Sequence, residues 1–164
     1  LSPSKFSSIV SSVFKQLSIP LLTIASVLAL AYLMNYAGMT STLGLAFAAT
    51  GALFPFFSAM LGWIGVFLTG SDTAANALFG TLQVVTANAL DLNPVLTAST
   101  NAATGVMGKM ISLQSIAVAA TGLVSSDEGK LFRVTLKHSI ILAISMAVVT
   151  MIFAYVLPQL VPQV

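Results

Sequence analysis

The sequence predicts an all-α integral membrane protein, a transmembrane helix bundle that contains broken helices or re-entrant hairpins. Of its 164 residues, 57% are hydrophobic and only 6% are charged, whereas soluble domains average about 25% charged residues. The mean hydropathy is +1.02. The charges are unevenly placed, because none lies between Lys15 and Asp72 and none follows Lys137. Such gaps accommodate helices of the roughly 20 apolar residues that cross a bilayer.

The composition also excludes several classes of function. The chain has no cysteine, so disulfide scaffolds, thiol catalysis and cysteine metal sites are ruled out. One histidine and four acidic residues make a multi-ligand metal site improbable. Six basic residues do not form the clustered basic face that nucleic-acid binding needs. We therefore expect no cofactor and no nucleic-acid partner. No catalytic arrangement of serine with histidine, or of paired carboxylates, is apparent in the clear spans, so we expect no enzyme.

Residues 1–17 are predicted to form an amphipathic helix at the membrane interface. The chain begins with Leu1 rather than Met and shows no signal peptide, so we expect the C-terminal part of a longer protein. Pro3 suits a first helical turn. Apolar side chains recur at helical spacing and define a face that would lie in the headgroup region: Phe6, Ile9, Val10, Val13, Phe14 and Leu17.

Residues 18–61 are predicted to form two transmembrane helices, over 18–37 and 42–61, joined by a turn at 38–41. The first span ends in Tyr32, Asn35 and Tyr36, residues that suit a membrane interface. The second span carries small residues that would let a neighbouring helix approach closely: Gly44, Ala48 and Gly51. Pro55 is expected to kink it.

Residues 126–164 are predicted to contain an amphipathic start and the final transmembrane helix, over 138–157. Ser125 and Glu128 have the spacing of a capping box, and Pro158 and Pro162 would end the helix. Basic residues gather in two places: Lys5 with Lys15, and Lys130 with Arg133 and Lys137. The positive-inside rule puts both clusters in the cytoplasm.

Residues 62–125 are apolar but contain many Gly, Ser, Thr, Asn and Gln residues. Because both flanking clusters are expected on one side, this region must return to the side where it began. Two half-helix hairpins, or two full crossings with breaks, would satisfy that requirement. Irregular backbone is tolerated at membrane depth only where it is buried in protein or lines a cavity. We therefore expect the functional site in this region.

Two polar elements, residues 70–79 and 101–115, contain Asp72 and Lys109, the two charged residues that lie within the region expected in the membrane. Each combines a glycine with hydroxyl and amide side chains next to an ionisable residue. Asp72 has two readings: it caps a helix that starts at Thr73, or it takes part in proton coupling or ligand binding. Lys109 either snorkels or bonds terminal carbonyls near Gly108, or it binds a carboxylate in a polar cavity. The two residues could also pair with each other.

Two further ionisable residues have plainer explanations. Asp91 precedes Leu92, Asn93 and Pro94, so we expect a solvated loop acid. His138 opens the last span and is expected at the cytoplasmic interface, although its titration near neutral pH leaves a proton role open.

At the polar elements the sequence resembles the bacterial lactate permease family. The resemblance is specific from about residue 61 to residue 139 and weaker on either side. It is carried by residues 61–73, 76–79, 82–83, 105–106, 108–112, 114–124, 131–133 and 137–139. The chain departs from the family pattern, which commonly has hydroxyl residues at positions 74, 75 and 103, glycine at 104 and proline at 113. Here these are Ala74, Ala75, Ala103, Thr104 and Leu113.

This resemblance implies a multi-pass secondary transporter of the bacterial cytoplasmic (inner) membrane. Family members carry lactate, and often glycolate, in symport with protons, and the chain would be roughly their last third. Its partners would be the lipid bilayer, lactate or a related small hydroxy-carboxylate, and the preceding part of the same permease. H⁺ would be the coupling ion.

The site hypothesis assigns each part of lactate to a set of groups. Lys109 and backbone N–H groups of residues 104–108, which include Thr104 and Gly105, would hold the carboxylate. Asp72 would take the coupled proton, since burial favours the neutral form of a carboxyl group. Six side chains would reach the substrate hydroxyl: Ser71, Thr73, Asn76, Asn101, Ser112 and Gln114. The rival hypotheses are a non-transporting membrane subunit or channel component, and an inactive truncated permease.

Overall fold

The computed structural model describes residues 3–121 and 128–162. Every element within these ranges is helical, which confirms the all-α prediction. Four helical segments are long and apolar enough to cross a membrane. In chain order the elements are α1 (Pro3–Tyr36), α2 (Met39–Ala48), η1 (Gly51–Leu53), α3 (Phe54–Thr69), α4 (Asp72–Ala89), α5 (Pro94–Lys109), α6 (Leu113–Thr121), α7 (Glu128–Tyr155) and η2 (Pro158–Leu160).

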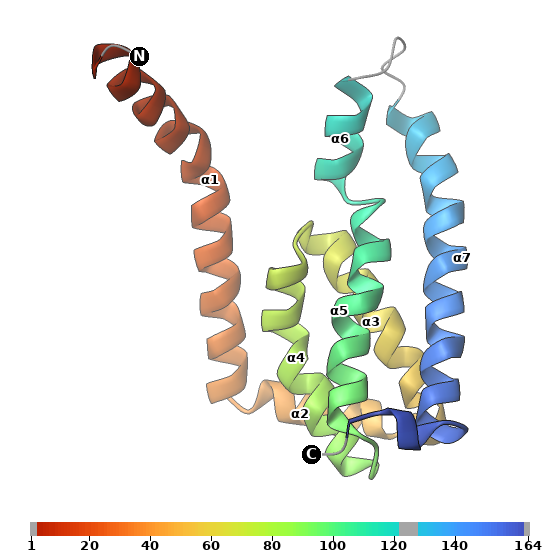
Figure 1. The fold of residues 1–164 in the computed structure, drawn as a ribbon. Helices are drawn as coiled ribbons and strands as arrows, with labels where there is room; N and C mark the ends of the chain where they lie inside the picture. Colours follow the sequence, from red (N-terminus) through yellow and green to blue (C-terminus); the bar gives the residue numbers. More distant parts are fainter. Residues whose placement is uncertain (1–2, 122–127, 163–164) are drawn as a thin grey trace.

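The first helix, α1, runs for 34 residues without interruption. It joins the predicted interfacial helix and the predicted first span into one element. The boundary expected after Leu17 is absent, and the Ser18 hydroxyl donates to the Lys15 carbonyl at 2.8 Å within the continuous helix. Figure 1 shows α1 standing apart from the other helices, and its main contacts are with α4 and α2.

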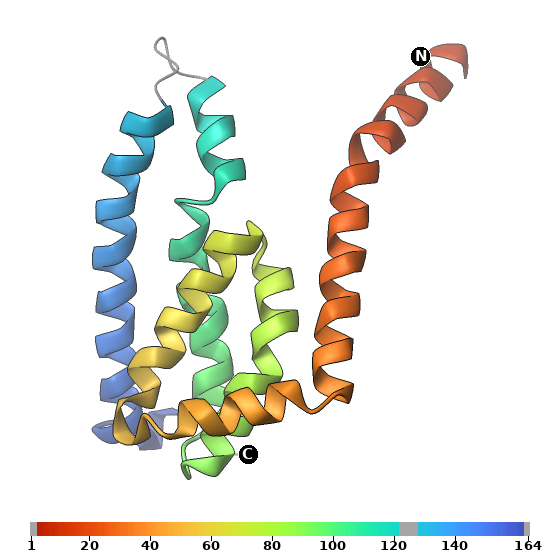
Figure 2. The same ribbon diagram turned by 180° about the vertical axis from the view of Figure 1, so that it is seen from behind.

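The span predicted over 42–61 is divided in the structure. α2 ends at Ala48, a short 3-10 turn follows in which Gly51 has a φ of +55°, and α3 begins at Phe54. Pro55 therefore lies in the first turn of α3, where proline is favoured, and kinks no helix. Gly44 packs against Val85 and Thr86 of α4 as a small residue should. Figure 2 shows α2 lying across the lower ends of the other helices.

The region after α2 contains one hairpin and one interrupted helix. α3 and α4 run in opposite directions from a tip at Gly70 and Ser71, and α5 and α6 are separated by residues 110–112. Both interruptions lie at a similar level, below the upper ends of α6 and α7 (Figure 1). The sequence left open two hairpins or two broken crossings, either of which would return the chain to the side where the region began. The structure instead has one hairpin and one broken crossing, so the region ends at the opposite end of the molecule from the start of α3 (Figure 1). The expected return is wrong because the stretch over 42–61 makes no full crossing.

The last long helix, α7, descends beside α5 and α3. It is described from Glu128, and the predicted cap Ser125 lies outside the described residues. The start of α7 and the start of α1 are at the same end of the molecule (Figure 1). Both basic clusters therefore lie at one end, as the sequence predicts. α7 ends at Tyr155, close to the predicted position.

The tightest packing is between α3 and α5. A Cβ atom added at Gly62 would overlap the Asn101 backbone, and one added at Gly108 would overlap the Trp63 carbonyl, so the two helix backbones touch. α7 is tied to both helices by Ser139. Its hydroxyl accepts from Trp63 Nε1 at 2.8 Å and donates to the Met107 carbonyl at 2.5 Å. This core holds the two interruptions in place.

Candidate functional site

The hairpin tip and the interruption between α5 and α6 are joined by Lys109. Its Nζ donates to the Gly70 carbonyl and, at 3.3 Å, to Gln114 Oε1. A cation is favourable there because helix C-termini present unpaired carbonyls and partial negative charge. Of the two plain expectations for Lys109, bonding of terminal carbonyls is the one observed, although the carbonyl belongs to the end of α3 rather than to Gly108.

The hairpin tip is formed by residues with a local preference for it. Gly70 ends α3 with a φ of +66°, a left-handed conformation that glycine adopts readily. The Ser71 hydroxyl accepts from the Ala74 N–H at 3.3 Å and caps α4. Asp72 is the first residue of α4, so the expectation that it caps a helix starting at Thr73 is wrong, since Ser71 is the cap.

The second interruption falls after Lys109. Ser112 is buried, and its hydroxyl donates to the Lys109 carbonyl at 3.1 Å and accepts from the Ser115 N–H at 3.4 Å. It therefore caps α6, in the way that Ser71 caps α4. Residues 104–108 lie inside α5, where backbone N–H groups bond within the helix. The N–H groups of residues 104–108 are therefore not free to bind an anion as predicted. N–H groups without intrahelical acceptors occur instead in the first turns of α4 and α6.

A cavity of 360 Å³ opens between α1, the hairpin tip and α6. It has a polar side, to which Ser71 and Gln114 contribute, and an apolar side formed mainly by α1. Its lining residues are Thr23, Ile24, Val27, Thr69, Gly70, Ser71, Ala74 and Gln114. Lys109 touches two of these residues. A small polar molecule in this cavity would therefore meet hydroxyl and amide groups with a cation directly behind them.

Asp72 belongs to a second polar cluster beside the tip. Its Oδ2 accepts from Asn76 Nδ2 at 3.0 Å, and Asn76 Oδ1 accepts from Asn101 Nδ2 at 2.8 Å. Its Oδ1 is buried and has no partner among the described residues. That oxygen lies against Gly105, where an added Cβ would be 2.5 Å from it. Gly105 therefore provides the space for the carboxylate.

Within the described residues, no ion pair joins Asp72 to Lys109. The Asp72 carboxylate is bonded to Asn76, and the Lys109 ammonium is bonded to the Gly70 carbonyl and to Gln114. The pairing that the sequence left open is therefore not formed. The Asp72 carboxylate and the Lys109 ammonium therefore have separate hydrogen-bond partners.

The remaining candidates lie away from the cavity or bond within their own helix. Thr73 is exposed, and the Thr104 hydroxyl donates to the Thr100 carbonyl at 2.7 Å. Asp91 is an exposed loop residue, as predicted. His138 is exposed on α7, with Nδ1 2.8 Å from the Val134 carbonyl oxygen.

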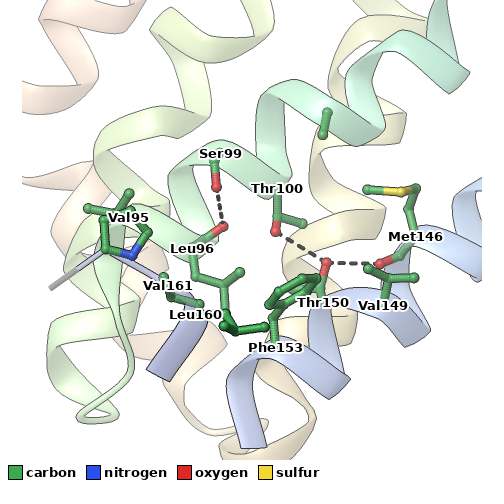
Figure 3. Close-up of a pocket in the computed structure, with 12 residues that line it drawn as sticks. Val95, Leu96, Ser99, Thr100, Met146, Val149, Thr150, Phe153, Leu160 and Val161 are labelled. Atoms are coloured by element: carbon green, nitrogen blue, oxygen red, sulfur yellow. Dashed lines mark hydrogen bonds between the residues drawn. The ribbon is translucent and has the colours of Figure 1, made fainter. Parts of the chain in front are cut away.

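A different pocket, of 270 Å³, lies between α5, α7 and the C-terminal segment. Figure 3 shows its apolar walls, in which Thr100 and Thr150 bond to each other at 3.2 Å. The Ser99 and Thr150 hydroxyls are bonded to backbone carbonyls of their own helices. None of its lining residues is ionisable or was predicted as a site residue. We therefore place the candidate site at the hairpin tip.

Three polar residues near the site were not predicted. Thr23 and Thr69 line the cavity, and Gln83 is completely buried between α3, α4 and α5. The signal for Gln83 is in the sequence, because an amide in an otherwise apolar membrane helix needs buried partners. Thr23 has no such signal, since its position depends on how α1 packs.

A hairpin and an interrupted helix that meet at a polar cavity, within a bundle of long apolar helices, define a segment of an all-α membrane transporter. The chain belongs to the L-lactate permease family, which it matches over residues 1–157. This family consists of transporters, not enzymes. The resemblance seen in the sequence is thereby confirmed.

Curated relatives are similar over most of the chain. It is 51% identical over 150 residues to the L-lactate permease of Bacillus subtilis (strain 168), covering 90% of this chain and 26% of the relative. It is 55% identical over 139 residues to the glycolate permease GlcA of Escherichia coli (strain K12), covering 84% and 25%. The chain is 49% identical over 164 residues to the L-lactate permease of Escherichia coli (strain K12), and the match covers 99% of this chain and 30% of the relative. The chain thus spans less than a third of these relatives' length. No solved structure gives a significant match.

Proposed function

We propose that the chain is part of a permease that imports lactate, and also the smaller 2-hydroxy acid glycolate, in symport with protons. The observation that carries this proposal is the meeting of two helix interruptions at one polar cavity, with Lys109 joining them. Interrupted helices of this kind bind small ions and substrates in secondary transporters. The relatives named for lactate and glycolate support the substrate class.

The substrate carboxylate binds at the level of Lys109. The ammonium group and the first-turn N–H groups of α6 both attract an anion. Ser71 and Gln114 line the cavity beside them and reach the substrate hydroxyl. The apolar residues Ile24, Val27 and Ala74 face the methyl group. A substrate with one carboxylate, one hydroxyl and a small alkyl group satisfies this arrangement.

Asp72 carries the coupled proton in this proposal. One of its carboxylate oxygens is buried without a partner, which is costly for an ionised group and is relieved by protonation. Asn76 and Asn101 hold the carboxylate rather than the substrate, because their amides are bonded to Asp72 and to each other. The site residues thus form two groups. Lys109, Ser71 and Gln114 bind the substrate, whereas Asp72, with Asn76 and Asn101, binds the proton.

The permease lies in the bacterial inner membrane, with the end that carries both basic clusters in the cytoplasm. Lipid and the preceding part of the same permease cover the exposed apolar faces of α1 and α7. Alternating access follows from movement of the hairpin and interrupted helix relative to that preceding part.

The test uses a chimera in which this chain replaces the matching segment of the Escherichia coli L-lactate permease. Labelled lactate uptake into vesicles is measured with and without an imposed pH gradient. Asp72→Asn is expected to abolish gradient-driven uptake, and Lys109→Ala to raise the lactate KM by about tenfold or more, the loss of one charge-assisted hydrogen bond. Ser145→Ala is the control, because this exposed hydroxyl bonds only within α7.

Uptake indistinguishable from the unaltered chimera in both variants would overturn these assignments. The alternative, a non-transporting subunit or an inactive product, makes a different prediction. An unaltered chimera that reaches the membrane at the parent's level would then show no saturable, gradient-dependent uptake.

A further inference from the structure

A line of buried amide side chains connects Asp72 to the centre of the α3, α4 and α5 packing. Gln83 Nε2 donates to Asn101 Oδ1 at 3.0 Å, Asn101 Nδ2 donates to Asn76 Oδ1 at 2.8 Å, and Asn76 Nδ2 donates to Asp72 Oδ2 at 3.0 Å. Gln83 and Asn101 are both completely buried. Every donor in this amide line (Gln83, Asn101 and Asn76) points towards Asp72.

The direction of the amide line is set at Gln83. The same Nε2 group also donates to the backbone carbonyl of Ser58 at 3.0 Å, and a carbonyl can only accept. If the Gln83 amide were reversed, its oxygen would face that carbonyl. The observed orientation is kept although it leaves Gln83 Oε1 buried with no partner among the described residues. Asn101 and Asn76 must then each turn an oxygen towards Gln83 and an N–H towards Asp72.

The two oxygens of the Asp72 carboxylate are consequently unequal. Oδ2 receives the Asn76 N–H, and a donated hydrogen bond stabilises negative charge on that oxygen. Oδ1 is buried, receives no hydrogen bond within the described ranges, and faces Gly105. Oδ1 is therefore the more basic oxygen.

We propose that Gln83 is a positioning residue that fixes the donor direction of the amide line, so that the coupled proton binds Asp72 at Oδ1, on the side of Gly105. The inference rests on the proposed function for the use of that proton in transport. On protonation, a hydronium ion loses one O–H bond and becomes water, while one O–H bond forms at Oδ1 and the carboxylate becomes a neutral acid. The amide line keeps its direction.

The charged and titratable groups around the amide line belong to several helices. Lys109 of α5 is bonded to the Gly70 carbonyl and Gln114. Tyr32 of α1 lines a 290 Å³ cavity together with Asn76. α3 presents Val66 beside Gly105 and the Ser58 carbonyl. Gln83 is linked to Asp72 by hydrogen bonds through the amides and not through Lys109, so the effects of the two residues can be separated.

The experiment measures protonation of Asp72 directly, by infrared spectroscopy of the purified chimera. The carboxylic-acid C=O band that is absent in Asp72→Asn belongs to Asp72, and its intensity is followed as a function of pH. Gln83→Met keeps the size of the side chain but removes the N–H group that donates to Asn101, so the Asn101 and Asn76 amides can reverse. The midpoint of the band is expected to rise by about one pH unit, because part of a charge-assisted hydrogen bond to the ionised form is lost.

Thr97→Val is the matched control. Its hydroxyl donates to the Gln83 backbone carbonyl at 3.3 Å in the same buried junction, but it is not part of the amide line, so the midpoint should stay unchanged. An unshifted midpoint in Gln83→Met, or an equal shift in Thr97→Val, would overturn the inference. If Gln83→Met does not accumulate, Asn101→Leu breaks the same line and must give the same upward shift. A shifted midpoint without any lactate uptake rejects the proposed function alone.

Discussion

The two interruptions that meet at the site stop their helices in different ways. At the hairpin tip, Gly70 takes a left-handed conformation, and Ser71 caps the next helix, so the turn is built from its own residues. Residues 110–112 include neither glycine nor proline. There the chain turns through N–H groups of Ile111 and Ser112, which bond three residues back at 3.2 Å.

The second interruption has its own cap, Ser112, and side chains from elsewhere in the fold also contact it. An α-helix that continued past Lys109 would bring the Ile111 N–H to the Met107 carbonyl, but this N–H bonds to the Gly108 carbonyl instead. The Met107 carbonyl accepts from Ser139 of α7. Trp63 of α3 holds Ser139 in place. The comparison teaches that both interruptions have a serine cap, whereas the first adds a glycine at its turn and the second adds contacts with α3 and α7.

The largest effect is expected from breaking the local turn with Gly70→Ala. The new Cβ would lie 2.9 Å from the Gln114 side chain, and the left-handed backbone costs a non-glycine residue on the order of 1 kcal/mol. Uptake by the chimera should fall about tenfold or more. Gly80→Ala is the matched control, because nothing lies within 4 Å of its added Cβ and alanine favours the helix. Equal uptake in the two variants would show that the turn does not need glycine.

A smaller effect is expected from Ser139→Ala, which removes the contacts of α7 with the interruption after Lys109. The part-buried Trp63 N–H and Met107 carbonyl would each lose a partner, at a cost of about 1–3 kcal/mol. If about 1 kcal/mol of this reaches the site, the lactate KM rises roughly fivefold. Ser145→Ala on the same helix serves as the control. A KM that does not change, with normal expression, would mean that the interruption holds without α7.

The smallest effect is expected from Leu113→Pro, which would add a second local signal to the interruption, beside the Ser112 cap. Leu113 is the first residue of α6 and is 79% exposed, a position where proline is well tolerated. We expect stability to rise by about 0.4–1 kcal/mol, seen as a higher thermal midpoint of the purified chimera, with uptake close to that of the parent. A lower midpoint would show that the backbone at residue 113 cannot accept proline.

Much of this fold could be predicted because membrane helices follow hydrophobicity and charge. The apolar stretches of α1 and α7, the basic clusters at one end, and the turn at Gly70 are all explained by local composition. The two polar elements also identified the region where Ser71, Lys109 and Gln114 meet. These features depend on residues that act near their own place in the chain.

The remainder depends on contacts between distant segments. The stretch over 42–61 is apolar throughout, and hydropathy alone does not show that it turns at Gly51. Ser139 bonds the Met107 carbonyl beside the interruption after Lys109, and Gln83 in the amide line bonds the Ser58 carbonyl. Hydrogen bonds to backbone carbonyls leave no pattern in the sequence, so residues 104–108 were predicted as anion-binding although they lie within α5.

The central claim, that the two interruptions meet around one cavity, is tested most directly by cross-linking. The chain contains no cysteine, so Ser71→Cys with Gln114→Cys can be introduced into a chimera that lacks other cysteines. A short bifunctional thiol reagent should join this pair rapidly in native membranes, and lactate should slow the reaction. The control pair, Ser71→Cys with Ser99→Cys, combines residues that line different cavities and should not react. A 71–114 pair that cross-links no faster than the control, with or without lactate, would contradict the account.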